Sequence, residues 1–285
     1  MIGKTRHESA DGAIVTLTDG VGPARGMLRG PGVTGKFWHS RTAPDEGLRD
    51  FVEHFWIVRW DLTGHAPQQS ETLPHPNVHL VLARNDSRIA GPHTSRFVRT
   101  LEGGGQVLGV KFRPGGFHPF FRKPIATLAD TSLPLADVFG DASGDLEETV
   151  LAQEDDAAMI DAVSCFLLER RPIADPRVDE VSHIVASIVH DRSITSVDHL
   201  VQRHALDKRA LQRLFAKYVG VSPKWVINRY RLHDALERLA QGVPVDWASV
   251  ALDLGYFDQA HFIRDFRRLV GRTPLEYARS LTPAG

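Results

Sequence analysis

The sequence predicts an α+β protein with a mainly β, barrel-like N-terminal module and an all-α C-terminal domain. In the first half of the chain, segments rich in β-branched and aromatic residues alternate with turns rich in Gly, Pro and Asn. Towards the C-terminus the apolar residues recur at helical spacing, and one sequence pattern occurs twice. The second half is therefore expected to contain two similar helical units.

The N-terminal part is divided by its composition. Residues 1–35 are rich in Gly and polar residues and are expected to be mostly loop, with one strand near residues 13–17. Residues 36–171 are expected to form a β-rich domain with further strands and terminal helices. The expected strands lie within 51–60, 77–82 and 106–112, and the expected helices within 144–171.

Residues 172–177 are predicted to be a linker, because Pro172 and Pro176 interrupt any helix at this point. Residues 178–285 then form the C-terminal domain. Each copy of its repeat predicts a helix, a short turn and a second helix, which is the helix-turn-helix arrangement. The copies are offset by 51 residues: Leu211-x-Arg213-x-Phe215-x-Lys217-x-x-Gly220-x-Ser222-Pro223 returns as Phe262-x-Arg264-x-Phe266-x-Arg268-x-x-Gly271-x-Thr273-Pro274.

Gly220 and Gly271 are expected to end the second helix of each copy with a positive φ, which glycine adopts without a Cβ clash. Pro223 and Pro274 can each begin the following helix. Between the copies, residues 223–241 are expected to form one helix about 28 Å long, at about 1.5 Å per residue. Successive major-groove segments on one face of DNA are about 34 Å apart, so such a spacer suits two DNA-reading helices.

A helical bundle with a basic surface is the alternative, because charged helix faces are usually only solvated. Two matched copies, each with Arg and Gln on its second helix, favour DNA binding. The charge distribution points the same way. From Pro176 onward there are 16 Lys and Arg against 12 Asp and Glu, whereas the residues before it carry 18 against 23.

At its C-terminal motifs the chain resembles the arabinose-regulator (AraC/XylS) family of bacterial transcription factors, over roughly residues 178–280. The resemblance implies that both helix-turn-helix units bind double-stranded promoter DNA, with RNA polymerase as a further partner. Most members activate transcription and some repress it. The motifs are Arg229-Tyr230-Arg231-Leu232-x-x-Ala235-Leu236, Ala251-x-x-x-Gly255-Tyr256-x-Asp258-Gln259-Ala260-His261-Phe262-x-Arg264-x-Phe266 and Gly271-x-Thr273-Pro274-x-x-Tyr277.

The resemblance also assigns DNA-contacting positions. Arg can bridge guanine O6 and N7 and Gln can pair with adenine, whereas Ala260 and Ile263 offer at most contact with a thymine methyl. The second unit is thus poorer in base-reading groups than the first. The base-reading residues are Lys208, Arg209, Gln212 and Arg213 in the first unit and Gln259, Ala260, His261, Ile263 and Arg264 in the second. Phosphate contacts position a protein on DNA without specifying the base sequence. The residues assigned to them are Lys217, Lys224, Arg267, Arg268 and Arg272.

The N-terminal domain resembles the sensor-like domain often fused ahead of this type of DNA-binding domain. Many such regulators use a small β-barrel to bind a small-molecule effector or to form a homodimer. We expect an effector pocket, with core packing and a tight Pro-Gly-Gly turn as the alternative role of the same residues. The motifs are Leu48-x-x-Phe51-Val52-Glu53-x-Phe55-Trp56, Leu73-Pro74-x-Pro76-x-Val78-x-Leu80 and Gly109-Val110-Lys111-Phe112-Arg113-Pro114-Gly115-Gly116. The pocket candidates are Phe51, Trp56, Trp60, Arg113 and Phe117.

The remaining features argue against other classes of protein. Cys165 is the single cysteine, so no internal disulfide can form; its flanks predict burial on a helix. The absence of a signal sequence and of an 18-residue apolar run predicts a cytoplasmic, nucleoid-associated protein that contacts no membrane.

No enzyme function is expected, because the phosphate-binding glycine motifs and the nucleophile elbow are missing. The DNA-repair proteins that share this type of domain need reactive or metal-bound cysteines, which one cysteine cannot supply. The fourteen histidines show no tight ligand spacing, so neither a metal nor a cofactor is expected. The remaining alternative is a ligand-binding β-module with a helical tail of weak, non-specific DNA affinity.

Overall fold

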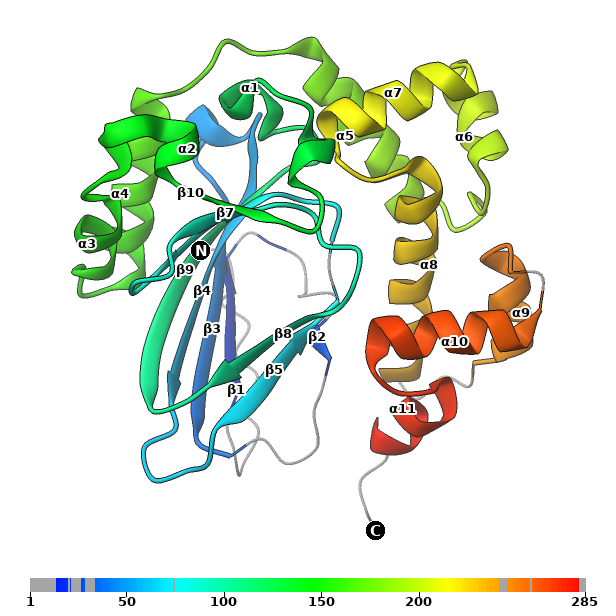
Figure 1. The fold of residues 1–285 in the computed structure, drawn as a ribbon, viewed down its shortest axis with the longest axis horizontal. Helices are drawn as coiled ribbons and strands as arrows, with labels where there is room; N and C mark the ends of the chain where they lie inside the picture. Colours follow the sequence, from blue (N-terminus) through cyan, green and yellow to red (C-terminus); the bar gives the residue numbers. More distant parts are fainter. Residues whose placement is uncertain are drawn as a thin grey trace.

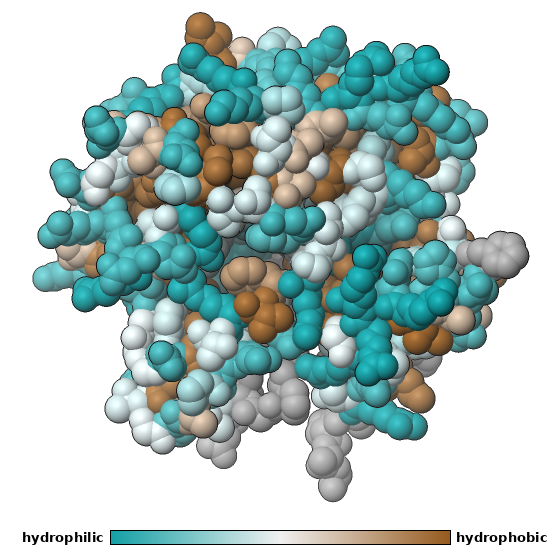
Figure 2. All heavy atoms as spheres, viewed as in Figure 1, coloured by the Kyte–Doolittle hydropathy of each residue, from teal (hydrophilic) through white to brown (hydrophobic). Residues whose placement is uncertain are grey.

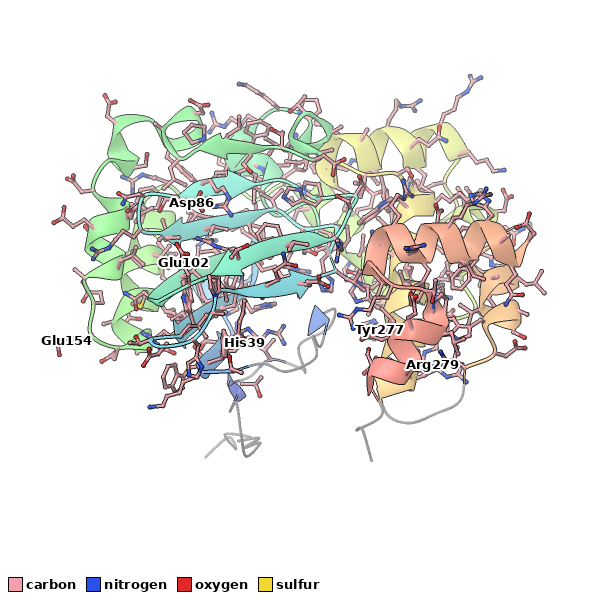
Figure 3. All side chains as sticks on the ribbon, turned by 60° about the horizontal axis from the view of Figure 1, so that its bottom comes forward. His39, Asp86, Glu102, Glu154, Tyr277 and Arg279 are labelled. Carbon is pink, nitrogen blue, oxygen red and sulfur yellow. The ribbon has the colours of Figure 1, made fainter. Side chains whose placement is uncertain are left out.

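The structure, a computed structural model, describes residues 14–19, 21, 27–28, 34–73, 75–240, 245–256 and 258–281. Over these residues a β module is followed by a helical region, and the two lie side by side in both views of the ribbon (Figures 1 and 3). The predicted fold class is confirmed, since the strands precede residue 135 and the helices from α5 (Pro176–His190) onward follow without a strand among the described residues.

The β module contains two sheets within the described ranges. The larger has the strand order β1-β3-β4-β9-β6-β7-β10, and the smaller has the order β2-β5-β8. The pair β1 and β3 is parallel, and the other paired strands are antiparallel. The strands are β1 Ile14–Asp19, β2 Met27–Leu28, β3 Lys36–Thr42, β4 Val52–Asp61, β5 Gln68–Thr72, β6 His79–Ala83, β7 Arg88–Ala90, β8 Phe97–Leu101, β9 Gly104–Phe112 and β10 Ser132–Pro134.

The two faces of the larger sheet pack against different neighbours, because successive side chains of a strand point to opposite faces. Phe55 and Ile57 of β4 belong to the main core of the module. Trp56 and Trp60, which alternate with them, pack in a separate cluster on the opposite face. The Trp56 ring lies over Gly109 of β9, where a Cβ atom would collide with the indole.

Helices cover the main-core face of the larger sheet. α3 and α4 contribute Leu146, Val150, Met159 and Val163 to the core beneath them, and they lie beside the sheet in Figure 1. The short helices of the module are η1 Glu46–Leu48, α1 His118–Phe121, η2 Ile125–Leu128, α2 Ala136–Phe139 and η3 Gly140–Ser143, followed by α3 Leu146–Leu151 and α4 Asp156–Glu169.

The prediction that Cys165 is buried was wrong. Cys165 is exposed on α4. The buried side of this helix is defined by Met159, Val163, Phe166 and Leu167. At about 100° per residue, Cys165 lies about 200° around the helix from Val163 and therefore faces away from the sheet.

The helical region begins earlier than the predicted linker allowed. α5 starts at Pro176, which is tolerated in the first turn because no hydrogen bond from its nitrogen is needed there. The Asp175 side chain caps the helix by accepting a 3.0 Å hydrogen bond from the Arg177 backbone N–H. The helices of this region are α5 Pro176–His190, α6 Val197–His204, α7 Lys208–Tyr218, α8 Pro223–Ala240, α9 Trp247–Asp253, α10 Gln259–Val270 and α11 Pro274–Leu281.

The helical region has two apolar cores, and α8 contributes to both. Val226 and Tyr230 of α8 pack with the core of α5, α6 and α7. Leu232 and Leu236 pack with the core of α9, α10 and α11, and Leu73 of the β module joins this second core. α8 thus joins the two units as the expected long helix. None of the helices in the described ranges is long and apolar enough to cross a membrane.

Candidate nucleic-acid interface

Helices α6 and α7 form the first helix-turn-helix unit. The Ser196 hydroxyl caps α6 by accepting a 3.3 Å hydrogen bond from the His199 N–H. Asp207 caps α7 by accepting a 2.8 Å hydrogen bond from the Ala210 N–H. The turn between the helices passes through Ala205 at φ 50°, a left-handed conformation that alanine rarely adopts. These local contacts fix where α7 begins and in which direction it leaves the turn.

Helices α9 and α10 form the second unit with the same local chemistry. Asp246 caps α9 by accepting a 3.0 Å hydrogen bond from the Ala248 N–H. Asp258 caps α10 by accepting a 2.7 Å bond from the His261 N–H. Both recognition helices, α7 and α10, therefore start at an aspartate N-cap, as a repeated unit requires.

The predicted helix ends are confirmed at both recognition helices. Gly220 follows α7 with φ 90°, and Gly271 ends α10 with φ 81°. Both values lie in the left-handed region, which is open to glycine because it lacks a Cβ atom. The two copies of the sequence pattern thus produce two similarly terminated helices.

The residues predicted to read bases lie on exposed surfaces of the two recognition helices. Five of them have exposed side chains and no ion pair or hydrogen bond to another described side chain: Arg209, Gln212, Arg213, Gln259 and Arg264. These groups are free to meet a ligand without breaking an existing contact.

The other predicted base-reading positions are more constrained. Lys208 is exposed but forms a 2.6 Å ion pair with Asp198. The His261 ring lies edge-on to Tyr256 with a centroid distance of 5.2 Å, and its Nε2 is 3.9 Å from an Asp265 oxygen. Ala260 is exposed, whereas Ile263 is half-buried against the second core.

Most of the predicted phosphate contacts are also exposed. Lys217 lies over the Tyr218 ring, with its Nζ 5.2 Å from the centroid. Arg268 pairs with Asp265 at 3.3 Å, and the half-buried Arg272 donates to the Ser280 hydroxyl at 3.1 Å. Hydrophilic side chains cover much of the helical region on the face seen in Figure 2. Lys224 and Arg267 are the remaining exposed members of the predicted set.

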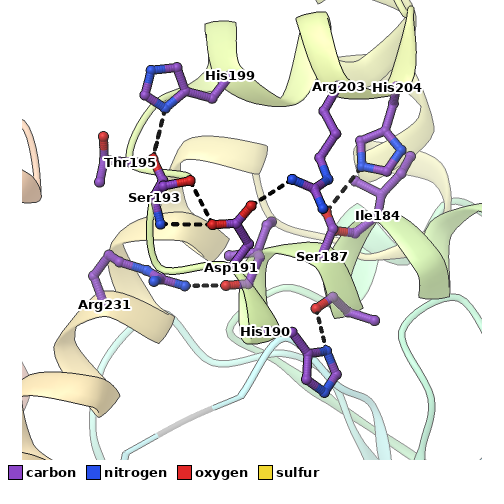
Figure 4. Close-up of polar contacts among 12 residues, drawn as sticks. Ile184, Ser187, His190, Asp191, Ser193, Thr195, His199, Arg203, His204 and Arg231 are labelled. Carbon is purple, nitrogen blue, oxygen red and sulfur yellow. Dashed lines mark hydrogen bonds and ion pairs between the residues drawn. The ribbon is translucent and has the colours of Figure 1, made fainter.

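A polar network holds the first unit against α5 and α8 (Figure 4). Asp191 forms a 2.5 Å ion pair with Arg203 of α6 and accepts a 2.9 Å bond from the Ser193 N–H. Hydrogen bonds from Ser193 and the Arg203 charge hold the pKa of Asp191 below its ordinary value. Arg231 of α8 donates to the carbonyl oxygen of Ile188. Asp191 thus ties the α5–α6 connection to α6, and Arg231 ties α8 to the end of α5.

Four polar residues of α8 are buried, which helical spacing alone does not predict. The fractional exposures are 2% for Arg229, 6% for Arg231, 4% for His233 and 8% for Asp234. Burial lowers the pKa of Arg229 to about 10. Arg229 and Arg231 belong to the quoted family motif, but helical spacing alone places them on a polar side. Arg229 is bonded to Thr94 of the β module, whereas Arg231 is bonded to Ile188 of α5, so tertiary packing and not helical spacing buries them.

The five predicted effector-pocket residues do not line one pocket. Phe51 and Phe117 fill the main core, each with 1% exposure. Trp56 and Trp60 lie on the opposite face of the sheet. Arg113 donates a 3.1 Å hydrogen bond to the Arg49 carbonyl and lies 4.0 Å from a carboxylate oxygen of Asp179 on α5. Strand alternation places Trp56 and Trp60 on the face opposite the main core that contains Phe51 and Phe117, so the five candidates do not converge in one place.

The β module has a cleft elsewhere, between β3 and the start of α4. Its volume is about 300 Å³, and both apolar and charged side chains line it. Ser40 donates a 2.5 Å hydrogen bond to Asp156 at its edge. In the part of the chain that the structure describes, no three His, Cys, Asp or Glu side chains converge as metal ligands would. The charged lining residues are Arg41, Asp45, Asp156 and Asp161.

Two capped helix-turn-helix units on one connecting helix define a double helix-turn-helix domain, a class that binds DNA. Residues 200–280 match the family model of the helix-turn-helix domain and form a helix-turn-helix domain of the AraC type. Residues 40–134 match a domain of unknown function (DUF6597), which corresponds to most of the β module.

Curated proteins with similar sequences are transcriptional regulators by name. The chain is 24% identical over 99 residues to an uncharacterized HTH-type transcriptional regulator of Haemophilus influenzae, covering 35% of this chain and 33% of that protein. It is 31% identical over 108 residues to the uncharacterized HTH-type transcriptional regulator YtdP of Bacillus subtilis, covering 36% of this chain and 14% of YtdP. The matches therefore span a third or less of these relatives.

Solved structures of ToxT from Vibrio cholerae overlap with the chain at a low level. One is 13% identical with a TM-score of 0.36, covering 76% of this chain and 90% of ToxT. Another ToxT structure is bound to (E)-4-(8-methylnaphthalen-1-yl)but-3-enoic acid. It is 14% identical with a TM-score of 0.36, and the match covers 75% of this chain and 91% of ToxT. An overlap of this size supports no inference about the ligands of the present protein.

Proposed function

We propose that this protein is a sequence-specific DNA-binding transcription regulator whose two recognition helices read successive major-groove segments. The observation that carries the proposal is the duplicated unit. Each copy has an aspartate-capped recognition helix whose N-terminal half exposes Arg, Gln or His side chains. The proposed partners are promoter DNA and RNA polymerase, with activation as the mode of control.

The free side chains of the first unit support base reading most directly. Arg209, Gln212 and Arg213 are exposed on α7 and carry the donor and acceptor groups that suit guanine and adenine edges. In the second unit, Gln259 and Arg264 offer the same chemistry on α10. We therefore assign the larger share of sequence discrimination to the first unit and weaker discrimination to the second.

Selection from a random duplex library tests this function. Wild-type protein is expected to enrich a two-part motif, with the better defined half bound by α7. Arg213→Ala and Gln212→Ala should each cost about 1–3 kcal/mol on that motif and relax the preference at one or two base pairs. Gln202→Ala is the control, because Gln202 is exposed on α6, outside the predicted contacts.

Two results would contradict parts of this proposal. If no motif is enriched, with or without added metabolites, the protein is better described as a ligand-binding β module with a weakly DNA-binding tail. If Arg213→Ala lowers the affinity for random and selected DNA equally, Arg213 contacts phosphate and not a base.

Regulation through the N-terminal module is the second part of the proposal. It acts either by binding a small-molecule effector or by forming a homodimer. An effector must favour one conformation by differential affinity, so it must change DNA binding and not merely occupy a site. Because Phe51 and Phe117 fill the core and Arg113 contacts α5, an effector is expected to bind elsewhere in the module. Sedimentation of the free protein across a concentration series distinguishes the two.

A further inference from the structure

The loop between β7 and β8, residues 91–96, contacts both helix-turn-helix units and the helix that joins them. We propose that this loop, termed here the 91–96 strap, fixes the relative position of α7 and α10 and so sets the spacing between the two DNA segments that they read. The inference rests on the proposed function and assigns the strap as a determinant of its specificity.

The first contact is at the end of α7. A Cβ atom built on Gly220 would lie 2.9 Å from Cγ of Pro92, and 2.8 Å and 2.9 Å from Cγ2 and the carbonyl oxygen of Ile125 in η2. The glycine that ends the first recognition helix is therefore covered by backbone and a rigid ring. Such neighbours cannot move aside as the end of a flexible side chain can.

The second contact is on α8. Nη2 of Arg229 donates a 3.2 Å hydrogen bond to the carbonyl oxygen of Thr94. The guanidinium lies 4.7 Å from the Trp225 ring, and its Nε and Nη1 are buried without a hydrogen-bond partner among the described residues. Since a buried guanidinium needs acceptors, the bond to Thr94 ties the strap to the connecting helix.

The third contact is at the end of α10. The nearest neighbour of a Cβ atom built on Gly271 would be the guanidinium of Arg96. Arg96 is held in place by a 2.7 Å ion pair with Glu71, at the end of β5. Pro92 and Arg96 thus contact the equivalent glycines of the two repeats, 51 residues apart in the sequence.

The strap is anchored within its own module. Asp130 accepts a 2.6 Å hydrogen bond from the Thr94 N–H and a 2.7 Å bond from the Thr94 hydroxyl. The Asp130 N–H donates in turn to the Pro92 carbonyl oxygen at 3.0 Å. Because the strap joins β7 of the larger sheet to β8 of the smaller one, its position depends on both sheets.

The position of the contacts points to spacing control and not to masking of the DNA-binding surface. The strap meets each recognition helix at its C-terminal glycine, whereas the predicted base-reading residues occupy the N-terminal halves and, apart from the half-buried Ile263, are exposed. A shift of one base pair moves a half-site by about 3.4 Å and rotates it by about 35°, since one turn takes 10–10.5 base pairs over about 34–36 Å. Two recognition helices held in fixed relative positions cannot adjust to both the translation and the rotation of a half-site.

Two variants release the strap at different points, and a third serves as the control. Asp130→Ala removes the two acceptors that hold Thr94, and Arg96→Ala removes the group next to Gly271. Arg99→Ala is matched to Arg96→Ala, because Arg99 is also an arginine near the start of β8 but pairs with Asp86 inside the β module at 3.4 Å. All three lie outside the predicted DNA contacts.

DNA binding is measured on duplexes that carry the two selected half-sites at spacings from two base pairs below the optimum to two above. Wild type and Arg99→Ala should prefer the optimum by roughly tenfold or more over a one-base-pair change, as the rotation of about 35° requires. Asp130→Ala and Arg96→Ala should reduce that preference to about threefold or less. Spacing profiles that match the wild type in both variants overturn the proposal.

A measurement without DNA separates this inference from the proposed function. Spin labels on Gln202→Cys of α6 and Ala248→Cys of α9, in a Cys165→Ser background, report the distance between the two units. A single narrow distance distribution is expected, and Asp130→Ala should broaden it. An unchanged distribution in Asp130→Ala and Arg96→Ala rejects the strap even if DNA is bound. If wild type selects no DNA, the proposed function fails while the distances still test the strap.

Discussion

The Tyr218 hydroxyl, at the end of α7, donates a 2.7 Å hydrogen bond to Oδ2 of Asp175, the residue that caps α5. The Tyr218 ring also packs against the ring of His118 in α1, and the two ring centroids are 4.2 Å apart. One tyrosine therefore connects the first recognition helix, the start of the helical region and the β module. Burial and the Asp175 bond raise the pKa of Tyr218 to about 12, so the hydroxyl remains a donor at neutral pH.

Tyr218→Phe should lower the free energy of unfolding by about 1 kcal/mol at neutral pH, through loss of this hydrogen bond. Partial burial alone would raise the pKa of Asp175, but the bonds from Tyr218 and the Arg177 N–H hold it below its ordinary value. A carboxylate with a lowered pKa stabilises the fold above its unfolded pKa of about 3.9 and loses that effect as the pH falls towards the folded value. The difference in free energy of unfolding between wild type and Tyr218→Phe should thus shrink below about pH 4.

Urea unfolding of Tyr218→Phe, Asp175→Asn and the double variant checks this relationship as a double-mutant cycle. We expect the two single effects to be strongly non-additive at pH 7. Additive effects would mean that the hydrogen bond contributes nothing measurable to stability.

The three glycines of the helix-turn-helix units are expected to differ in their tolerance of alanine. Gly255→Ala should cost about 1 kcal/mol for its positive φ alone, because nothing lies within 4 Å of its Cβ position. Gly271→Ala should cost slightly more, since it displaces the end of the Arg96 side chain. Gly220→Ala should cost about 2 kcal/mol or more, because the Ile125 carbonyl cannot yield. Thermal unfolding of the three variants gives the order of their losses in stability. Equal losses at all three sites would contradict the contact between Gly220 and Ile125.

Lys217→Ala should weaken binding to selected and random DNA alike and reduce the slope of log affinity against log salt by about 0.9, the value for one phosphate contact. Lys123→Ala is the matched control: its Nζ lies 5.5 Å from the centroid of the Phe121 ring, much as Lys217 lies over Tyr218, but it belongs to the β module. Fluorescence anisotropy between 50 and 200 mM salt measures both slopes. An unchanged slope in Lys217→Ala removes this lysine from the interface.

Two histidines of the larger sheet should make the protein less stable in mild acid. Burial, together with nearby Arg and Lys charges, lowers the pKa of His39 to about 4 and that of His79 to about 3. Neutral His79 also accepts a 3.2 Å hydrogen bond from the Trp56 indole at Nδ1. Because the unfolded chain takes up protons near pH 6.5 and the folded chain does not, stability is complete above that pH and falls below it.

The expected loss is at most about 1.4 kcal/mol per pH unit for each histidine between about pH 6 and pH 4. Urea unfolding at several pH values measures it, and His79→Gln should give a shallower pH dependence than wild type. His65→Gln is the control, since His65 is exposed in a turn. If wild type and His79→Gln have parallel pH dependences, His79 is not held neutral by the fold.

The sequence alone determined the features that depend on local chemistry. The repeat, the aspartate caps at Asp207 and Asp258 and the left-handed glycines Gly220 and Gly271 follow from short-range rules of helix initiation and termination. The order of a β module followed by a helical region follows from the change in apolar spacing from two to about 3.6 residues. The base-reading residues remain predictions, because contacts with bases can be assigned only in a complex with DNA.

The tertiary structure decided which residues of the two halves meet. Arg229 carries a polar side chain in a helical pattern, yet packing of the β module leaves it 2% exposed and bonded to Thr94. Phe51 and Trp56 are both aromatic residues of one segment, yet they face opposite sides of the sheet. No local rule relates Pro92 and Arg96 to Gly220 and Gly271, because contacts between residues this far apart in the chain depend on how the two halves pack.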